Sequence, residues 1–160
     1  MRLALFEPDI PQNCGTILRM AACFGVPVDI IEPCGFIFGG RQMRRAGMDY
    51  LDQVDVSQHA SWAKFAESRA ESQVNSRANL VGRLVLLTTR AEQTHTNFQF
   101  KSNDCLILGR ESAGVPDLIH DSVDARLRIP MESGLRSLNV AISAAVVLGE
   151  ALRQTSGFPK

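Results

Sequence analysis

Short apolar runs of strand length are the feature that most constrains what this chain can fold into. The first two runs cover residues 3–6, ended by Glu7 and Pro8, and residues 26–31. Between them, residues 15–24 carry apolar side chains at helical spacing. A strand, a helix and a second strand within about thirty residues are typical of a parallel crossover unit.

The rest of the chain continues this alternation. We expect, in chain order, a short strand at 54–56, a helix at 61–70 that Ser61 caps, a polar surface linker at 71–83, strands at 84–89 and 105–109, a strand and turn at 127–131, and a long helix from about 137 to 154. This pattern predicts an α/β fold with a mostly parallel sheet and flanking helices. Because the chain has 160 residues and is 45% hydrophobic, we expect one domain over residues 1–160.

The long final helix is apolar on more than one face. Its apolar positions are Leu138, Ala141, Ile142, Ala145, Val146, Leu148 and Leu152. We expect such a helix to be buried against a partner chain as well as against its own sheet.

Composition excludes several classes of protein. No stretch approaches the roughly 20 apolar residues of a membrane span, and the first residues meet acid and proline too early for a signal peptide. We therefore expect a soluble, cytoplasmic protein with no membrane partner. The 17 basic residues balance 17 acidic residues, which excludes nucleic-acid binding by bulk positive charge, so any RNA contact must be local.

The four cysteines do not indicate a metal site or a disulfide framework. Cys14, Cys23, Cys34 and Cys105 form no C-x-x-C pair and have no histidine at ligand spacing. We expect no metal, and four reduced thiols that are mostly buried.

Three loops at the ends of predicted strands hold the candidate chemistry, because open parallel sheets bind ligands at this edge. The first, residues 7–19, is a rigid loop that enters a helix, with Asn13 near the cap and Arg19 one turn inside. Such a loop can present amides and an arginine to a phosphate. Taken alone, it is explained more simply as a capped turn with a surface arginine.

The second and third loops combine glycine with polar side chains. In residues 108–116, Gly109 and Gly114 lie on either side of a polar triplet, so backbone can approach a ligand and Glu111 can face a cationic group. A structural strand-to-helix turn explains this segment equally well. In residues 129–139, Ser137 is a candidate helix N-cap, whereas Asn139 inside a first turn needs a second reason because asparagine is a poor helix former.

Together the three loops resemble the three motifs of the SpoU branch of the SPOUT RNA methyltransferases. The likeness rests on the opening E-P-D-I-P-Q-N-C-G, on I-I-E-P-C-G-F followed by R-R-A-G-M-D-Y, and on I-P-M close to R-S-L-N, in this order across nearly the whole chain. Within that branch the chain is similar to the minimal enzymes that methylate the ribose 2′-hydroxyl of wobble nucleotide 34, a cytidine or modified uridine, in the tRNA anticodon loop.

The resemblance carries further expectations about architecture. It implies a C-terminal segment threaded through a loop as a deep trefoil knot, which general topology rules would not predict because true knots are rare. It also implies a homodimer and an S-adenosylmethionine molecule held in a bent pose by the loops of the knot.

The resemblance also assigns site residues. For cofactor binding it points to Leu87, Thr88, Gly109, Glu111, Gly114, Ile129, Met131, Ser137 and Leu138. It places Glu111, Asn139 and Arg19 at the reacting centre, and it turns Asn13 and Arg19 toward the RNA.

The chemistry of the reaction qualifies the role of Arg19. A ribose hydroxyl must lose its proton, and an arginine is a poor base because it stays protonated in proteins. We therefore expect Arg19 to grip a neighbouring phosphate and to stabilise developing oxyanion charge, while the phosphate or a side chain takes the proton. Arg41, Arg44 and Arg45, in a glycine-bordered stretch, form either a local phosphate-binding patch or an ordinary exposed loop.

Two segments depart from the family pattern. The polar stretch 72–82 is longer than the compact members need, and Glu132, Ser133 and Gly134 stand where a proline often occurs. We expect the first to be a surface insertion and the second to loosen a cofactor loop.

Other functions fit parts of the sequence. One is a SpoU-type 2′-O-methyltransferase acting on another tRNA position or on ribosomal RNA, and another is a knotted RNA-binding protein without catalysis. Retention of Arg19, Glu111, Ser137 and Asn139 favours an enzyme over the second alternative. A Rossmann-type nucleotide module fits least, because the first strand leads into proline and asparagine instead of the glycine fingerprint.

Overall fold

The computed structural model describes residues 1–40, 53–75 and 81–160. In chain order the elements are β1 (Arg2–Phe6), α1 (Pro11–Phe24), β2 (Val28–Ile31), β3 (Val56–His59), α3 (Trp62–Asn75), β4 (Leu84–Leu87), the 3-10 helix η2 (His95–Asn97), β5 (Cys105–Leu108), α4 (Asp117–Ser122), β6 (Ala125–Leu127) and α5 (Val140–Thr155).

The six strands form one sheet in the order β3-β2-β1-β5-β4-β6, and every pairing between them is parallel. Leu5 of β1 pairs with Ile30 of β2 on one side and with Leu108 of β5 on the other. The chain builds outward from β1 to β3 and then crosses to the other half, so its direction of growth reverses between β1 and β5. A crevice outside the carboxyl ends of strands at such a switch point is where open parallel sheets bind ligands. The predicted α/β fold with a mostly parallel sheet is confirmed.

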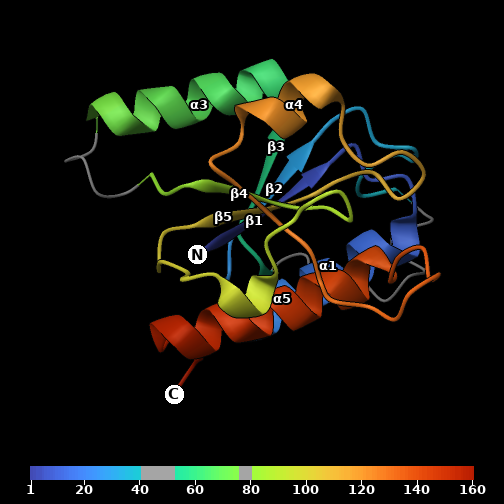
Figure 1. The fold of residues 1–160 in the computed structure, drawn as a ribbon. Helices are drawn as coiled ribbons and strands as arrows, with labels where there is room; N and C mark the ends of the chain where they lie inside the picture. Colours follow the sequence, from blue (N-terminus) through green and yellow to red (C-terminus); the bar gives the residue numbers. More distant parts are fainter. Residues whose placement is uncertain (41–52, 76–80) are drawn as a thin grey trace.

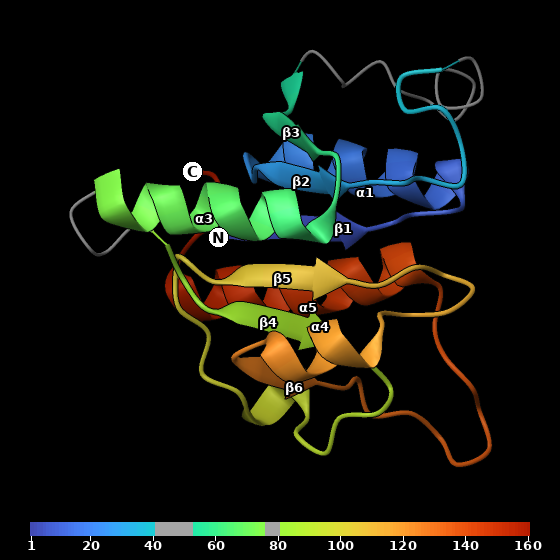
Figure 2. The same cartoon turned by 90° about the horizontal axis from the view of Figure 1, so that it is seen from above.

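Helices cover both faces of the sheet, with α1 and α5 on one face and α3 and α4 on the other (Figures 1 and 2). Because side chains alternate along a strand, β1 serves both layers. Leu3 and Leu5 belong to the core cluster under α1 and α5, whereas Ala4 and Phe6 belong to the cluster under α3 and α4.

Helix α1 begins at Pro11, earlier than the predicted residue 15. Proline suits the first turn because its fixed φ is helical and its missing N–H is not needed there. Asn13 therefore lies within the first turn, where it is buried. The helix ends at Phe24 and is capped by Gly25, whose φ of +64° is the left-handed conformation that favours glycine. The N–H of Gly25 donates to the carbonyls of Ala21 and Ala22.

Helix α5 is capped by Asn139, so the prediction of Ser137 as the N-cap is wrong. The Oδ1 of Asn139 accepts hydrogen bonds from the N–H groups of Ala141 at 2.8 Å and Ile142 at 3.3 Å. The cap satisfies two backbone donors that the first turn leaves without helical partners. The prediction that this helix is apolar on more than one face is confirmed. Its inner face buries Ala144, Val147, Leu148 and Ala151 completely, whereas Ile142 is 52% exposed and Val146 is 40% exposed.

Other boundaries also differ from expectation. Ser61 does cap α3, since its Oγ accepts from the N–H of Lys64 at 3.3 Å, but the helix continues to Asn75, so residues 71–75 of the predicted linker are helical. Strand β3 lies two residues later than predicted, and β6 ends at Leu127. Residues 128–131 consequently form a loop beside the sheet edge.

Within the described residues, no helix is long and apolar enough to cross a membrane. The strand order is consistent with the trefoil knot that the resemblance implies, and the knot itself stays a prediction.

Candidate active site

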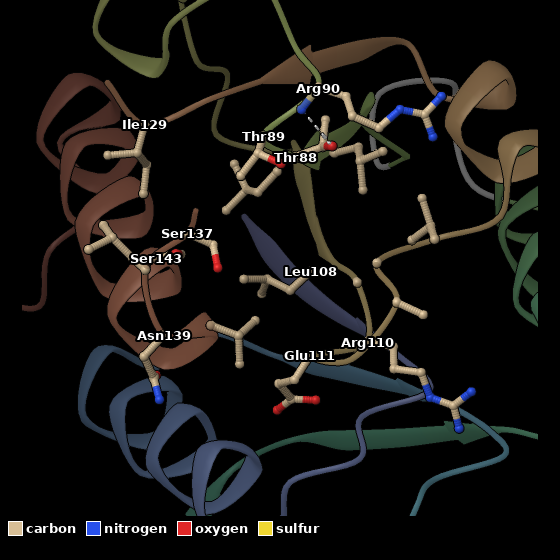
Figure 3. A pocket seen from close by; sticks show the side chains of 18 of the residues that line it. Thr88, Thr89, Arg90, Leu108, Arg110, Glu111, Ile129, Ser137, Asn139 and Ser143 are labelled. Atoms are coloured by element: carbon tan, nitrogen blue, oxygen red, sulfur yellow. Dashed lines mark hydrogen bonds between the residues drawn. The ribbon is translucent and has the colours of Figure 1, made fainter. Parts of the chain in front are cut away.

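A cavity of about 600 Å³ opens at the carboxyl ends of β4, β5 and β6. Its walls are the loop 88–90 after β4, the loop 109–115 after β5, Ile129 and Met131 after β6, and the start of α5 (Figure 3). A volume of this size is typical of sites for small organic ligands. The cavity lies at the switch-point edge that the sheet topology singles out.

The loop after β5 is closed on itself and requires glycine. The N–H of Arg110 donates to the carbonyl of Gly114 at 3.0 Å, and the N–H of Gly114 donates back to the carbonyl of Arg110 at 2.7 Å. A Cβ on Gly109 would lie 2.7 Å from the carbonyl carbon of Gly114, which is closer than real Cβ atoms come to backbone. Gly114 itself has a φ of +69°. The closed shape of the loop therefore requires glycine at both positions.

A chain of side-chain hydrogen bonds joins three elements at one end of the cavity. Glu111 Oε1 accepts from Asn13 Nδ2 at 3.1 Å, and Asn13 Oδ1 accepts from Asn139 Nδ2 at 2.8 Å. Glu111 Oε2 also accepts from the backbone N–H of Asp9 at 3.0 Å. Figure 3 shows Glu111 and Asn139 extending toward α1 from opposite walls. The loop after β1, α1, the loop after β5 and the start of α5 are thus held in one arrangement.

The charges around Glu111 are distributed unevenly. Arg110 lies 3.5 Å from Asp9, measured between Nε and Oδ2, and 3.4 Å from Glu7, measured between Nη1 and Oε2. Ser112 Oγ donates to the same carboxylate oxygen of Asp9. In Figure 3 the guanidinium of Arg110 turns away from the Glu111 carboxylate.

These surroundings shift the pKa values of Glu111 and Asp9 in opposite directions. Burial, followed by the neighbouring Asp9 side chain, raises the pKa of Glu111 above its usual value. Hydrogen bonding from the Glu111 carboxyl, together with Ser112 and Arg110, lowers the pKa of Asp9. Asp9 is therefore the ionised member of the pair, and Glu111 is the member that readily holds a proton.

Apolar side chains also line the cavity. They include Leu87, Ile129 and Leu138, and Thr88 follows Leu87 with its N–H donating to the carbonyl of Leu127 at 2.9 Å. The N–H of Arg90 donates to Thr88 Oγ1 at 3.2 Å (dashed line in Figure 3). A flat heterocycle can pack between such aliphatic side chains.

The structure brings most of the predicted site residues together. The residues predicted for cofactor binding that line this cavity are Leu87, Thr88, Gly109, Glu111, Gly114, Ile129, Met131, Ser137 and Leu138. Asn13 and Asn139 line it as well. Their individual roles stay predictions.

The predicted arginines are placed differently. Arg19 lies on an exposed position of α1, outside the residues that line the cavity. Arg41, Arg44 and Arg45 lie outside the described residues.

Sequence reasoning missed several residues around the cavity. Arg90, Arg110, His120 and Ser143 line it, and Asp9 adjoins it through Glu111. An available signal for Asp9 was its position just after the first apolar run, at the edge where ligands bind. His120 gave no local signal, because α4 is too short to show periodicity.

All four cysteines are free thiols, as expected, but only Cys14 and Cys105 are buried. Burial raises the pKa of the Cys105 thiol to about 12 and of the Cys34 thiol to about 11, and it raises that of Cys14 as well. Because the thiolate is the nucleophile, these three thiols are unsuited to covalent catalysis.

Three comparisons with known proteins relate to this geometry. The model of the SpoU rRNA Methylase family matches residues 1–149. A curated tRNA (cytidine(34)-2′-O)-methyltransferase of Beijerinckia indica is 54% identical over 158 residues, covering 99% of this chain and 94% of that protein.

Two solved structures are also similar. One, described as giving structural insights into the 2-OH methylation of C/U34 on tRNA, is 35% identical, with a TM-score of 0.86 over 98% of this chain and 96% of that one. The other is an AdoMet-bound rRNA methyltransferase from Sinorhizobium meliloti, 25% identical, with a TM-score of 0.81 over 95% of this chain and 55% of that one.

Proposed function

The chain belongs to the SpoU rRNA methylase family, and on that premise we propose that it is a tRNA 2′-O-methyltransferase that modifies the ribose of wobble nucleotide 34 with S-adenosylmethionine. The observation that carries the proposal is the curated relative that bears this activity and is 54% identical across 99% of the chain. The tRNA anticodon loop is accordingly the proposed substrate, and the cytoplasm is the proposed location.

The cavity fits S-adenosylmethionine. Its volume of about 600 Å³ suits a ligand of that size, and Gly114 leaves open the space that a Cβ would fill. Leu87, Ile129 and Leu138 would pack on the adenine, and backbone groups of the loops after β4 and β5 would bind its polar edges. When bound, S-adenosylmethionine supplies an electrophilic methyl group.

The residues at the other end of the cavity would act on the ribose. Asn139 and Asn13 hold Glu111 in place through their hydrogen bonds, and we propose that this acidic group lies beside the 2′-hydroxyl that must give up its proton. Arg19 would bind a phosphate near the target nucleotide and stabilise charge on the attacking oxygen. No step in this scheme requires a cysteine.

We also propose that the active form is a homodimer. Ile142 and Val146 lie one turn apart on α5 and leave an apolar stripe in water, and Leu138 extends it before the cap. A second copy of the same helix would cover this stripe in a self-complementary contact.

The test is direct. The purified protein is incubated with labelled S-adenosylmethionine and tRNA from a strain that lacks the enzyme, and new 2′-O-methyl groups are mapped by nucleoside and fragment mass spectrometry. Methylation at the ribose of nucleotide 34 is the expected result. Methylation at another position would refute the proposed substrate site, and a protein that binds the cofactor but methylates no tRNA would refute the proposed activity.

A further inference from the structure

Two carboxyl groups from distant parts of the chain meet beside the cavity. Asp9 follows β1 and Glu111 follows β5, and these strands are neighbours at the switch point. The N–H of Asp9 donates to Glu111 Oε2 at 3.0 Å. The carboxylate of Asp9 is bound instead to Ser112 and Arg110, the residues on either side of Glu111.

The position of Asp9 is fixed by a third loop. The N–H of Gly35 donates to the carbonyl of Pro8 at 2.9 Å. A Cβ on Gly35 would lie 2.7 Å from the Cβ of Asp9 and 2.8 Å from its Cα. Because backbone packs this tightly against Asp9, the backbone of Asp9 cannot move far from Glu111.

The neighbouring charges favour different protonation states in the two acids. The titratable and charged groups around Glu111 come from several elements. The loop after β1 supplies Asp9 and Glu7, the loop after β5 supplies Arg110, and α1 supplies the thiol of Cys14. The neutral Asn139 of α5 connects to Glu111 through Asn13. Arg110 pairs with both Asp9 and Glu7, whereas within the described part of the chain Glu111 forms no ion pair. One acid therefore has a counter-ion, and the other has a second acid beside it.

We propose that Glu111 accepts the proton of the ribose 2′-hydroxyl and that Asp9 is the positioning residue that keeps Glu111 suited to this task, an inference that rests on the proposed function. The ribose 2′-oxygen forms a bond to the methyl carbon while its proton passes to a Glu111 carboxylate oxygen. The bond between that carbon and sulfur breaks, and its electron pair stays on sulfur. Glu111 then releases the proton to water.

The arrangement predicts opposite effects for two substitutions. Glu111 must be ionised to act as a base, so the methylation rate falls as the pH drops through its pKa. Asp9→Asn removes the adjacent negative charge, lowers the pKa of Glu111 and moves this acid limb to lower pH. Arg110→Gln removes the positive charge that offsets Asp9 and Glu7, and it moves the limb to higher pH.

The experiment measures single-turnover methylation of tRNA against pH for the wild type and these two variants. We expect each shift to be on the order of one pH unit, and Glu111→Gln to lower the rate by about 100-fold or more. Glu67→Gln is the matched control, because it removes one acid from an exposed ion pair on α3, far from the cavity. Circular dichroism and thermal unfolding identify any variant that is misfolded.

A second readout does not depend on activity. Carbon-13 NMR of protein with labelled glutamate, assigned with Glu111→Gln, follows the Glu111 carboxyl in the free enzyme. We expect its titration midpoint to lie above that of an ordinary glutamate, to fall in Asp9→Asn and to rise in Arg110→Gln. An unchanged midpoint in both folded variants, or a uniform loss of rate without a shifted limb, would overturn the role of Asp9. A wild-type protein that methylates no tRNA would overturn the proposed function instead.

Discussion

Asn139 Nδ2 donates to Asn13 Oδ1 at 2.8 Å and so connects the N-cap of α5 to the first turn of α1 across 126 residues of chain. The same amide caps α5 through its Oδ1. In Asn139, Oδ1 therefore stabilises the start of α5, and Nδ2 belongs to the chain of hydrogen bonds that reaches Glu111.

Two substitutions at position 139 separate these roles. Asn139→Asp keeps the capping oxygen, so we expect a free energy of unfolding within about 0.5 kcal/mol of wild type. It replaces the donor to Asn13 with a second oxygen. Because the chain of hydrogen bonds through Asn13 ends at the carboxyl group of Glu111, we expect the methylation rate to fall roughly tenfold or more. Asn139→Ala loses cap and donor together and should also be about 1 kcal/mol less stable. Thermal unfolding and methylation rates measure both, and full activity in the Asp variant would contradict the importance of this bond.

Gly109→Ala tests the closed loop after β5. The new Cβ would meet the backbone of Gly114 at 2.7 Å, and overpacking of this kind typically costs about 1–3 kcal/mol. We expect the affinity for S-adenosylmethionine to fall about tenfold or more by calorimetry.

Gly25→Ala is the control for Gly109→Ala. Gly25 caps α1 with φ +64° and has open space around its Cα, so alanine there costs about 1–2 kcal/mol of backbone strain without reaching the cavity. If both variants lose cofactor affinity equally, general destabilisation explains the loss and the loop is not specific.

The sequence predicted the strands best where apolar runs are continuous. β1, β4 and β5 are central or near-central strands buried on both faces, so their composition alone marks them. α4 was missed because it has six residues and buries only Ile119. Ser137 was preferred to Asn139 as the cap because both are good capping residues, and only the backbone shows which one precedes the first helical turn.

Site residues could likewise be predicted where the signal is local. Glycines and polar residues that share one loop, such as Gly109 and Glu111, can be recognised from the sequence. The pairing of Asp9 with Glu111 does not, because these residues are 102 positions apart and meet only after β1 and β5 have paired. The imbalance of charge between the two acids is therefore a property of the fold.

Arg19 is predicted to act on RNA and not on the cofactor. It lies on an exposed position of α1 outside the cavity, so Arg19→Ala should leave the affinity for S-adenosylmethionine unchanged. Loss of a charged contact with phosphate should lower kcat/KM for tRNA about 10- to 100-fold. Arg19→Lys should keep part of the activity, because an ammonium still attracts phosphate without the bidentate geometry. Complete retention of activity in Arg19→Ala would defeat this role.

Ile142→Glu tests the proposed homodimer. Ile142 is 52% exposed in the single chain, at the middle of the stripe formed with Leu138 and Val146. In a twofold contact each copy would bury a new carboxylate, and burial of an unpaired charge costs several kcal/mol. We expect sedimentation to show a wild-type dimer and a monomeric variant whose circular dichroism is unchanged. Leu118→Glu is the control, because Leu118 is 80% exposed on α4, on the opposite face of the sheet. A dimer that survives Ile142→Glu as well as it survives Leu118→Glu would show that α5 is not its interface.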